Sequence, residues 1–258
     1  MYYLSSCSIV KNEDNYIDDF VTIHKHLGVE FFLFFDRSEN PLSEKYKGRS
    51  DIQVIHFPEP NRHAHAWREG VKFFAGKSKW VQFIDIDQVV VPMQTLDIKV
   101  MLQNYEAHAA LGLNWHSFGS SHLESEPPPG TSTYEAYTLR AAGETPINNH
   151  IQSIVQPSFI RQDTWSDPHH PPVMPGQHQI NERNQIFSGP FNIPPSQNVG
   201  FIAHYYTRSR EYWAKKCAKL RADTGTPGGT LAEFDHHQTY MNQVEDLTVK
   251  KIWESRNK

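Results

Sequence analysis

Apolar stretches alternate with helically spaced apolar positions through the first third of the chain. The stretches at 2–10, 31–35, 52–57 and 80–86 predict four strands, and the unbroken run at 31–35 is typical of a strand buried on both faces of a parallel sheet. Segment 14–27 and the segment that follows Asn61 carry apolar residues three and four positions apart, which predicts two helices. The alternation predicts right-handed βαβ units, and therefore an α/β fold.

The fourth predicted strand leads directly into two carboxylates, Asp85 and Asp87, separated by Ile86. Side chains alternate along a strand, so both carboxylates are expected on one face. Two such groups repel each other unless a cation or a hydrogen-bond donor compensates them, and hard oxygen ligands suit magnesium, manganese or calcium. An Asp-x-Asp sequence is also common in solvated turns and helix caps, so its meaning depends on the residues around it.

Polar clusters follow the other predicted strands as well. Ligands of open α/β sheets bind outside the carboxyl ends of the strands, where such clusters would gather. Each cluster alone is more typical of a loop or a helix cap than of a binding site, but four of them at one sheet edge favour a site. The sequence contains neither the glycine fingerprint of dinucleotide-binding folds nor a Walker loop, which argues against both classes. The clusters comprise Lys11, Asn12 and Glu13 after the first strand, Asp36 after the second, and Arg62 after the third.

Composition narrows the remaining classes. A chain of 258 residues with a formal charge of −4 has no basic footprint for nucleic acid. No apolar run approaches the ~20 residues that a membrane span requires, and two cysteines exclude a disulfide framework. As it stands, the chain is expected to be cytoplasmic, although a piece of a Golgi-type enzyme would have the same composition. Nothing in the sequence indicates an oligomeric state.

Four segments, at 11–38, 80–92, 114–121 and 204–216, together resemble glycosyltransferase family 92, in the order in which that family has them. The resemblance covers roughly 5–217. It implies a GT-A fold of α/β class, with a Rossmann-like nucleotide-binding half at 1–92 and a mixed sheet in an acceptor-binding half at 93–258, within one domain. It also implies transfer of a sugar, galactose in the animal members, from a nucleotide-sugar donor to a glycan or another hydroxyl acceptor. A UDP-sugar and an inverting reaction are the expectations.

The resemblance also assigns residues on the donor side. Asp85 and Asp87 correspond to the metal-binding DXD motif, and His204 to a histidine that completes the site for manganese or magnesium. Gln88 stands where the family usually has glutamate, so support of the metal from this position is open. The residues expected to contact the nucleotide sugar are Lys11, Asn12, Glu13, Asp36, Arg62, Asp85 and Arg208.

The acceptor side is expected at segment 114–121, where the indole of Trp115 could pack on a sugar ring, with Ser120 and His169. Trp115 could equally be a core residue. No motif identifies the base that takes the acceptor proton; Asp235 is the first candidate and Glu124 the second, although Asp235 could simply cap a helix over 238–244. Two other functions stay open: a metal-dependent phosphohydrolase or nucleotidyltransferase, and a catalytically silent relative that binds nucleotide or sugar.

Overall fold

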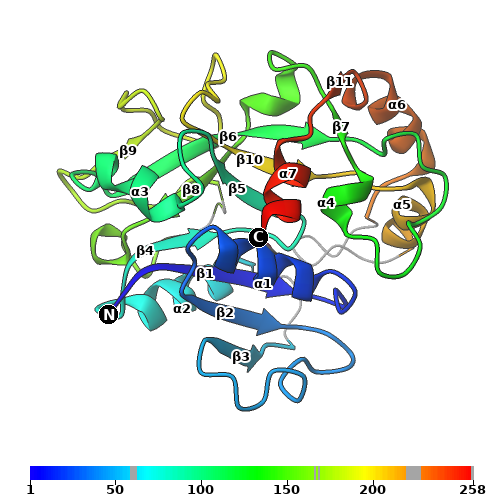
Figure 1. The fold of residues 1–258 in the computed structure, drawn as a ribbon. Helices are drawn as coiled ribbons and strands as arrows, with labels where there is room; N and C mark the ends of the chain where they lie inside the picture. The colour runs from blue at the N-terminus through cyan, green and yellow to red at the C-terminus, as the bar shows by residue number, and fades with distance from the viewer. Residues whose placement is uncertain (59–62, 166, 168, 219–227, 257–258) are drawn as a thin grey trace.

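The computed structural model describes all residues except 59–62, 166, 168, 219–227 and 257–258. Its centre is one sheet that continues through both halves of the chain, in the order β11-β7-β6-β8-β4-β1-β2-β3 (Figure 1). Outside this path, β9 and β10 pair with β6, and β5 pairs with β10. Helices flank the sheet on both faces. No helix in the described residues is long and apolar enough to cross a membrane.

The amino-terminal half is the predicted parallel unit. Strands β1, β2, β3 and β4 run parallel to one another in the order β4-β1-β2-β3, with two helices in the connections, and β4 pairs antiparallel with β8 on its other side. The described elements of this half are β1 (Tyr2–Val10), α1 (Ile17–His26), β2 (Phe31–Asp36), β3 (Ile52–His56), α2 (His63–Phe74) and β4 (Ser78–Phe83).

Each helix covers one face of this sheet. Phe20 of α1 packs against Phe32 and Phe34, which alternate with residues that point to the other face. On that other face, Trp67 of α2 packs edge-on against Phe83 of β4. The unbroken apolar run of β2 therefore divides its side chains between two cores, as a strand covered on both faces must.

One prediction about this half is wrong. The fourth strand was expected to reach residue 86, but β4 ends at Phe83 and the chain turns before β5 (Gln88–Pro92) begins. Residues 85–87 therefore lie in a turn and not on a strand. The partly exposed Asp85 and Asp87 nevertheless flank the buried Ile86, so the expected alternation of exposure is kept.

The second half is the predicted mixed sheet. β6 is antiparallel to β8 and parallel to β10, while β10 runs antiparallel to β5. The elements up to this point are α3 (Ile98–Leu102), η1 (Gln103–Tyr105), β6 (Ala110–Phe118), α4 (Thr133–Ala136), β7 (Leu139–Arg140), η2 (Pro146–Asn149), β8 (Ile151–Val155), η3 (Pro157–Phe159), β9 (Gln179–Ile180) and β10 (Gly200–Tyr205).

The carboxyl-terminal segment packs beside this half as α5 (Arg210–Cys217), α6 (Leu231–Met241), β11 (Val244–Glu245) and α7 (Thr248–Ser255). Thr230 caps α6 in a reciprocal capping box with Glu233. The helix therefore begins well before residue 238, and the alternative in which Asp235 is a helix cap is wrong.

Candidate functional site

Loops at the carboxyl ends of β1 and β2 are tied together by Asn12. Its backbone N–H donates to Ser38 Oγ at 2.8 Å, and its side-chain oxygen accepts from the N–H of Glu39 at 3.0 Å. Asn12 adopts a φ of 56°, a left-handed conformation that asparagine tolerates better than most residues. Lys11 lies immediately before it, half-buried at the end of β1. The structure thus brings the first two strand-end clusters together, as the parallel sheet predicts.

Asp36 at the end of β2 is fully buried and braces its own loop. One carboxylate oxygen accepts from Ser38 N–H at 2.9 Å and the other from Leu42 N–H at 2.6 Å. Both oxygens already have backbone partners, so a contact with a nucleotide, which the resemblance implies, stays a prediction. The remaining strand-end candidate, Arg62, lies outside the described residues.

Gln88 fixes the turn that carries the two aspartates. Its side-chain oxygen accepts from the N–H of Asp85 at 3.2 Å, while its own N–H donates to the carbonyl of Asp85 at 3.1 Å. The Gln88 side chain is fully buried. The side-chain amide of Gln88 therefore stabilises the turn by accepting a hydrogen bond from the turn's backbone. A glutamate carboxylate at this position could accept the same bond.

Asp87 and His204 form the centre of the site. His204 Nε2 on β10 lies 3.6 Å from Asp87 Oδ1, and the Asp87 side chain is only 17% exposed. Burial alone would raise the pKa of Asp87, but the nearby charges of His204, Lys216 and Arg208 outweigh it and hold that pKa well below its usual range. Asp87 is therefore a carboxylate anion at neutral pH, surrounded by cationic or proton-donating groups.

Asp85 faces outward beside this pair. Its side chain is 43% exposed, and its Oδ1 lies 3.9 Å from His63 Nε2 at the start of α2. The two aspartates therefore differ in environment: Asp87 belongs to the buried cluster, whereas Asp85 is available to solvent or to a ligand at the mouth of the site.

Arg208 is a buried cation behind Asp87. It is 1% exposed and lies between the rings of Tyr16 and Tyr212, with its guanidinium carbon 3.9 and 4.5 Å from the two ring centres. Its Nη1 lies 3.7 Å from Glu13 Oε2 at the start of the loop before α1. Burial lowers the pKa of Arg208, but the surrounding Tyr212, Glu13, Asp87 and Tyr16 raise it by more. Arg208 therefore stays protonated.

Trp115 on β6 is surrounded by three histidines. His150 stacks on its indole with ring centres 4.7 Å apart, His204 meets it edge-on at 4.4 Å, and His169 meets it edge-on at 5.5 Å. Trp115 is buried, as the alternative of a core residue predicts. Its contact with His204 nevertheless places the indole directly beside the Asp87 pair.

His169 is oriented by the first two residues of β8. Its Nδ1 lies 3.0 Å from both the Ile151 carbonyl and Gln152 Oε1, so Nδ1 carries the proton and Nε2 is the basic nitrogen of the neutral ring. Burial lowers the pKa of His169, and the charge of Asp85 partly counters this effect. The structure therefore places His169 beside Trp115 and within reach of the charge of Asp85.

Other predicted residues lie apart from this cluster. Ser120 is buried, where its hydroxyl bonds to Gln238 and accepts from the N–H of His122 at 3.1 Å. Asp235 forms an ion pair with Arg210, and Glu124 lies 3.9 Å from the same guanidinium. Both carboxylates are mostly exposed, so the two candidate bases share one surface cation.

Two residues of the cluster were not predicted. His150 follows a short 3₁₀ helix, and Lys216 lies on α5, where its charge lowers the pKa of Asp87. His150 belongs to no motif, and Lys216 is the last residue of segment 204–216, where no role was assigned to it. His150 joins the site because the β6 and β8 pairing brings Trp115 beside it, which the spacing along the chain does not show.

A sequence model of glycosyltransferase family 92 matches residues 2–224. A family 92 protein from Arabidopsis thaliana is 24% identical over 190 residues, which cover 65% of this chain and 31% of that protein. A second, from Ricinus communis, is 23% identical over 199 residues, or 70% of this chain and 33% of the relative. The chain thus spans about a third of the length of these curated relatives.

Solved structures give a weaker likeness. Staphylococcus aureus TarS aligns at a TM-score of 0.39 and 12% identity, over 64% of this chain and 32% of TarS. A UDP-glucose pyrophosphorylase solved with UDP-glucose aligns at a TM-score of 0.33 and 8% identity, over 100% of this chain and 98% of its own. The family match is therefore the finding that bears on function.

Proposed function

The chain belongs to glycosyltransferase family 92, and on this premise we propose that it transfers a sugar from a nucleotide-sugar donor to a hydroxyl acceptor. The observation that carries the proposal is the Asp87 and His204 pair, a largely buried carboxylate and an imidazole 3.6 Å apart near the carboxyl ends of parallel strands. This is where ligands of open α/β sheets bind.

A divalent metal fits the donor atoms of this pair. Asp87 Oδ1 is buried and has no hydrogen-bond partner among the described residues, which leaves it available as a ligand. Carboxylate oxygen together with imidazole nitrogen is acceptable to Mn²⁺, and magnesium is the alternative. Within the described ranges, no group of three or more His, Cys, Asp or Glu side chains could hold a metal. Metals at phosphate-transfer sites are commonly bound by one or two carboxylates and completed by substrate phosphates.

The donor diphosphate is the group that these residues would stabilise. Transfer breaks the bond between the anomeric carbon and the diphosphate oxygen, so negative charge develops on the leaving group. The bound metal would supply electrostatic stabilisation of that charge. Arg208 and Lys216 contribute positive charge around Asp87, and the partly exposed Asp85 would contact the metal or the donor ribose.

The acceptor would approach from the side of Trp115. Its hydroxyl oxygen bonds to the anomeric carbon and loses its proton to a base. Asp235 and Glu124 remain the proposed bases. The hydrogen bond from Arg210 lowers the pKa of Asp235, which weakens this carboxylate as a proton acceptor. His169, with Nε2 as its basic nitrogen, is the histidine on the acceptor side. We propose a UDP-sugar donor, galactose as the first sugar to test, and inversion.

The test is metal-dependent binding of UDP. Calorimetric titration of the wild type with UDP is expected to show at least about tenfold tighter binding with Mn²⁺ than with chelator, a difference of about 1.4 kcal/mol. Asp87→Asn and His204→Gln should lose that increment. Asp51→Asn is the matched control, because Asp51 precedes β3 at the opposite edge of the sheet and pairs with Arg49 and Lys25.

The result also separates the alternatives. If the wild type binds UDP with the same affinity with Mn²⁺ and with chelator, the proposed donor site is refuted. Metal-dependent binding with release of free sugar or phosphate but no transfer to any hydroxyl acceptor would indicate a hydrolase. Binding without turnover would indicate a silent relative.

A further inference from the structure

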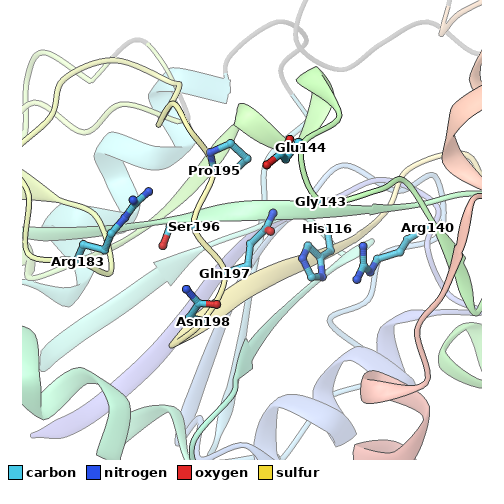
Figure 2. A pocket seen from close by; sticks show the side chains of 9 residues that line it. All are labelled: His116, Arg140, Gly143, Glu144, Arg183, Pro195, Ser196, Gln197 and Asn198. Atoms are coloured by element: carbon cyan, nitrogen blue, oxygen red, sulfur yellow. The ribbon is translucent and has the colours of Figure 1, made fainter.

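A pocket of about 410 Å³, referred to as the second pocket because it is separate from the Asp87 pair, lies in the second half of the chain. Its volume falls within the ~300–1,000 Å³ that is usual for small-molecule sites. Figure 2 shows that residues from four segments of the chain line it. They are His116, Arg140, Gly143, Glu144, Arg183, Pro195, Ser196, Gln197 and Asn198.

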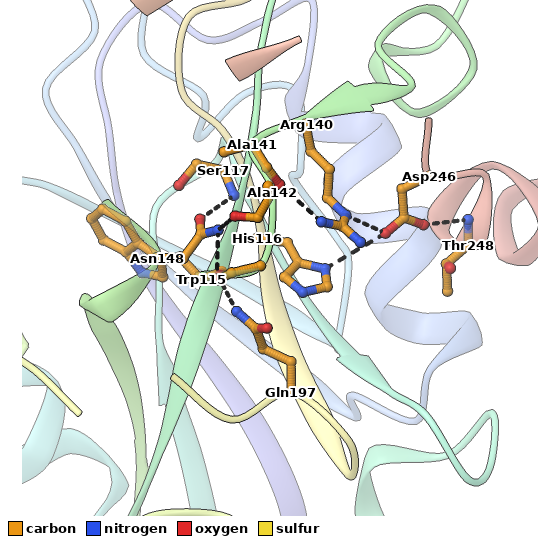
Figure 3. Close-up of polar contacts among 11 residues, drawn as sticks. Trp115, His116, Ser117, Arg140, Ala141, Ala142, Asn148, Gln197, Asp246 and Thr248 are labelled. Atoms are coloured by element: carbon orange, nitrogen blue, oxygen red, sulfur yellow. Dashed lines mark hydrogen bonds and ion pairs between the residues drawn. The ribbon is translucent and has the colours of Figure 1, made fainter. Parts of the chain in front are cut away.

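The pocket opens on the face of β6 opposite to the donor site. Successive residues of a strand point to opposite faces, and Trp115 packs on His204 whereas His116 packs on Phe201, with ring centres 4.1 Å apart. Figure 3 shows the two neighbours pointing apart. A ligand held at His116 therefore does not occupy the space beside Asp87.

The floor of the pocket is fixed from behind by a buried carboxylate. Asp246 Oδ2 accepts from Arg140 Nε at 2.6 Å and lies 3.5 Å from His116 Nδ1, while Asp246 Oδ1 accepts from Thr248 N–H at 3.0 Å (Figure 3). Arg140 Nη1 also donates to the Ala141 carbonyl at 2.8 Å. These contacts hold His116 and Arg140 in place before any ligand arrives, which lowers the entropic cost of binding.

The opposite wall is equally fixed. The buried Glu182 carboxylate accepts the Ser196 hydroxyl and the N–H groups of Asn198 at 2.9 Å and Val199 at 2.7 Å. Gln197 donates its side-chain N–H to the Trp115 carbonyl at 2.8 Å, which leaves its oxygen as an acceptor. The wall therefore presents polar groups that are already held in place, both hydrogen-bond donors and hydrogen-bond acceptors.

The charges of this site compensate each other. Asp246 pairs with Arg140 from behind, Arg183 donates to the Pro194 carbonyl at 3.0 Å, and Glu144 adds a second carboxylate to the lining. In Figure 2 the two arginines lie at opposite sides of the pocket, so they do not form a common clamp for an anion. The lining thus contains guanidinium donors as well as the acceptor oxygens of Gln197 and Glu144, a mixture that suits hydroxyl groups, because each hydroxyl both donates and accepts.

We propose that this pocket binds an uncharged sugar residue of a glycan, at a position separate from the transfer site. It would anchor a glycan chain on one face of β6 while chemistry takes place on the other. The proposal goes beyond sugar transfer and does not depend on it, because it stands on the lining of the pocket.

A steric block at Gly143 tests the proposal. A Cβ atom at this position would meet only Gln197 Oε1, at 3.7 Å, which is an ordinary contact, so a larger side chain can enter the pocket without disturbing the core. Saturation-transfer NMR would measure binding of maltotriose, cellotriose, lactose and N-acetyllactosamine, with trigalacturonate as the charged probe. The variants are Gly143→Phe, Gly143→Ala as the matched control, and Asp87→Asn.

At least one neutral probe is expected to bind the wild type, Gly143→Ala and Asp87→Asn, and to lose at least about tenfold in affinity in Gly143→Phe. Arg183→Ala, at an exposed position, should weaken the same probe about fivefold or more, which keeps the test decisive if Gly143→Phe fails to fold. Absence of neutral binding, binding unaffected by both variants, or tighter binding of trigalacturonate would each overturn the proposal.

The two proposals fail separately. Loss of metal-dependent UDP binding with glycan binding intact would refute the donor site and leave the second pocket standing. The reverse result would refute the second pocket alone.

Discussion

Acid should destabilise the protein through His24, a histidine inside the core. His24 lies on α1, fully buried against Phe20 with ring centres 4.2 Å apart. Its Nδ1 is 2.8 Å from the Phe20 carbonyl, so Nδ1 carries the proton of the neutral ring. Its Nε2 is buried without a hydrogen-bond partner among the described residues, so a second proton would introduce an unpaired buried charge.

The size of this loss of stability follows from the pKa of His24. Burial lowers the pKa of His24 from 6.5 to about 4, against the smaller opposing effect of its bond to Phe20. The unfolded chain therefore binds a proton at a pH where the folded chain does not, and stability falls as pH decreases through this window. Linkage gives a loss of roughly 0.8 kcal/mol near pH 6, roughly 2 near pH 5 and roughly 3 near pH 4, and almost none at pH 7.

The perturbation is His24→Leu, with His24→Gln as a second non-titrating variant. Urea unfolding of all three proteins at pH values from about 7 to about 4 gives the free energy of unfolding at each pH. The wild type should lose roughly 3 kcal/mol more than either variant across this range, whatever the offset between them at pH 7. Parallel curves for the wild type and both variants would refute the assignment of a buried, neutral His24.

Three further outcomes are expected. Arg208→Lys keeps the charge but loses the stacking between two tyrosine rings, and should cost roughly 2–4 kcal/mol of unfolding free energy; equal stability would contradict the stacked geometry. Glu182→Gln should cost roughly 2–4 kcal/mol in urea unfolding, because an amide cannot accept from every donor now facing the carboxylate, whereas the exposed Glu144→Gln should change little. Asp235→Asn should leave the melting temperature unchanged, and if this residue is the base it should lower kcat by roughly 10²–10⁴-fold; an unchanged kcat would remove it from the mechanism.

Part of the site follows from local pattern. The parallel strands were predicted from apolar runs, and parallel strands bring their carboxyl ends to one edge whatever the loops contain. The positions of Asn12, Asp36 and the two aspartates at that edge are therefore confirmed. The part played by each side chain is not a local property. Asp36 braces its own loop, and Gln88 holds a turn where a longer strand was expected.

The sequence by itself determined the alternation of strands and helices, the strand-end clusters and, through the order of four motifs, the family. The spacing of apolar residues is enough to predict the strands and helices, because each element must carry apolar side chains on every face that it buries. Tertiary structure alone decided which distant residues meet. His150 and His204 reach Trp115 because β8 and β10 border β6 on its two sides. The same strand sends His116 to the opposite face, where segments 140–144 and 195–198 enclose a second pocket. Contacts between strands far apart in sequence depend on register and packing, and no local pattern encodes them.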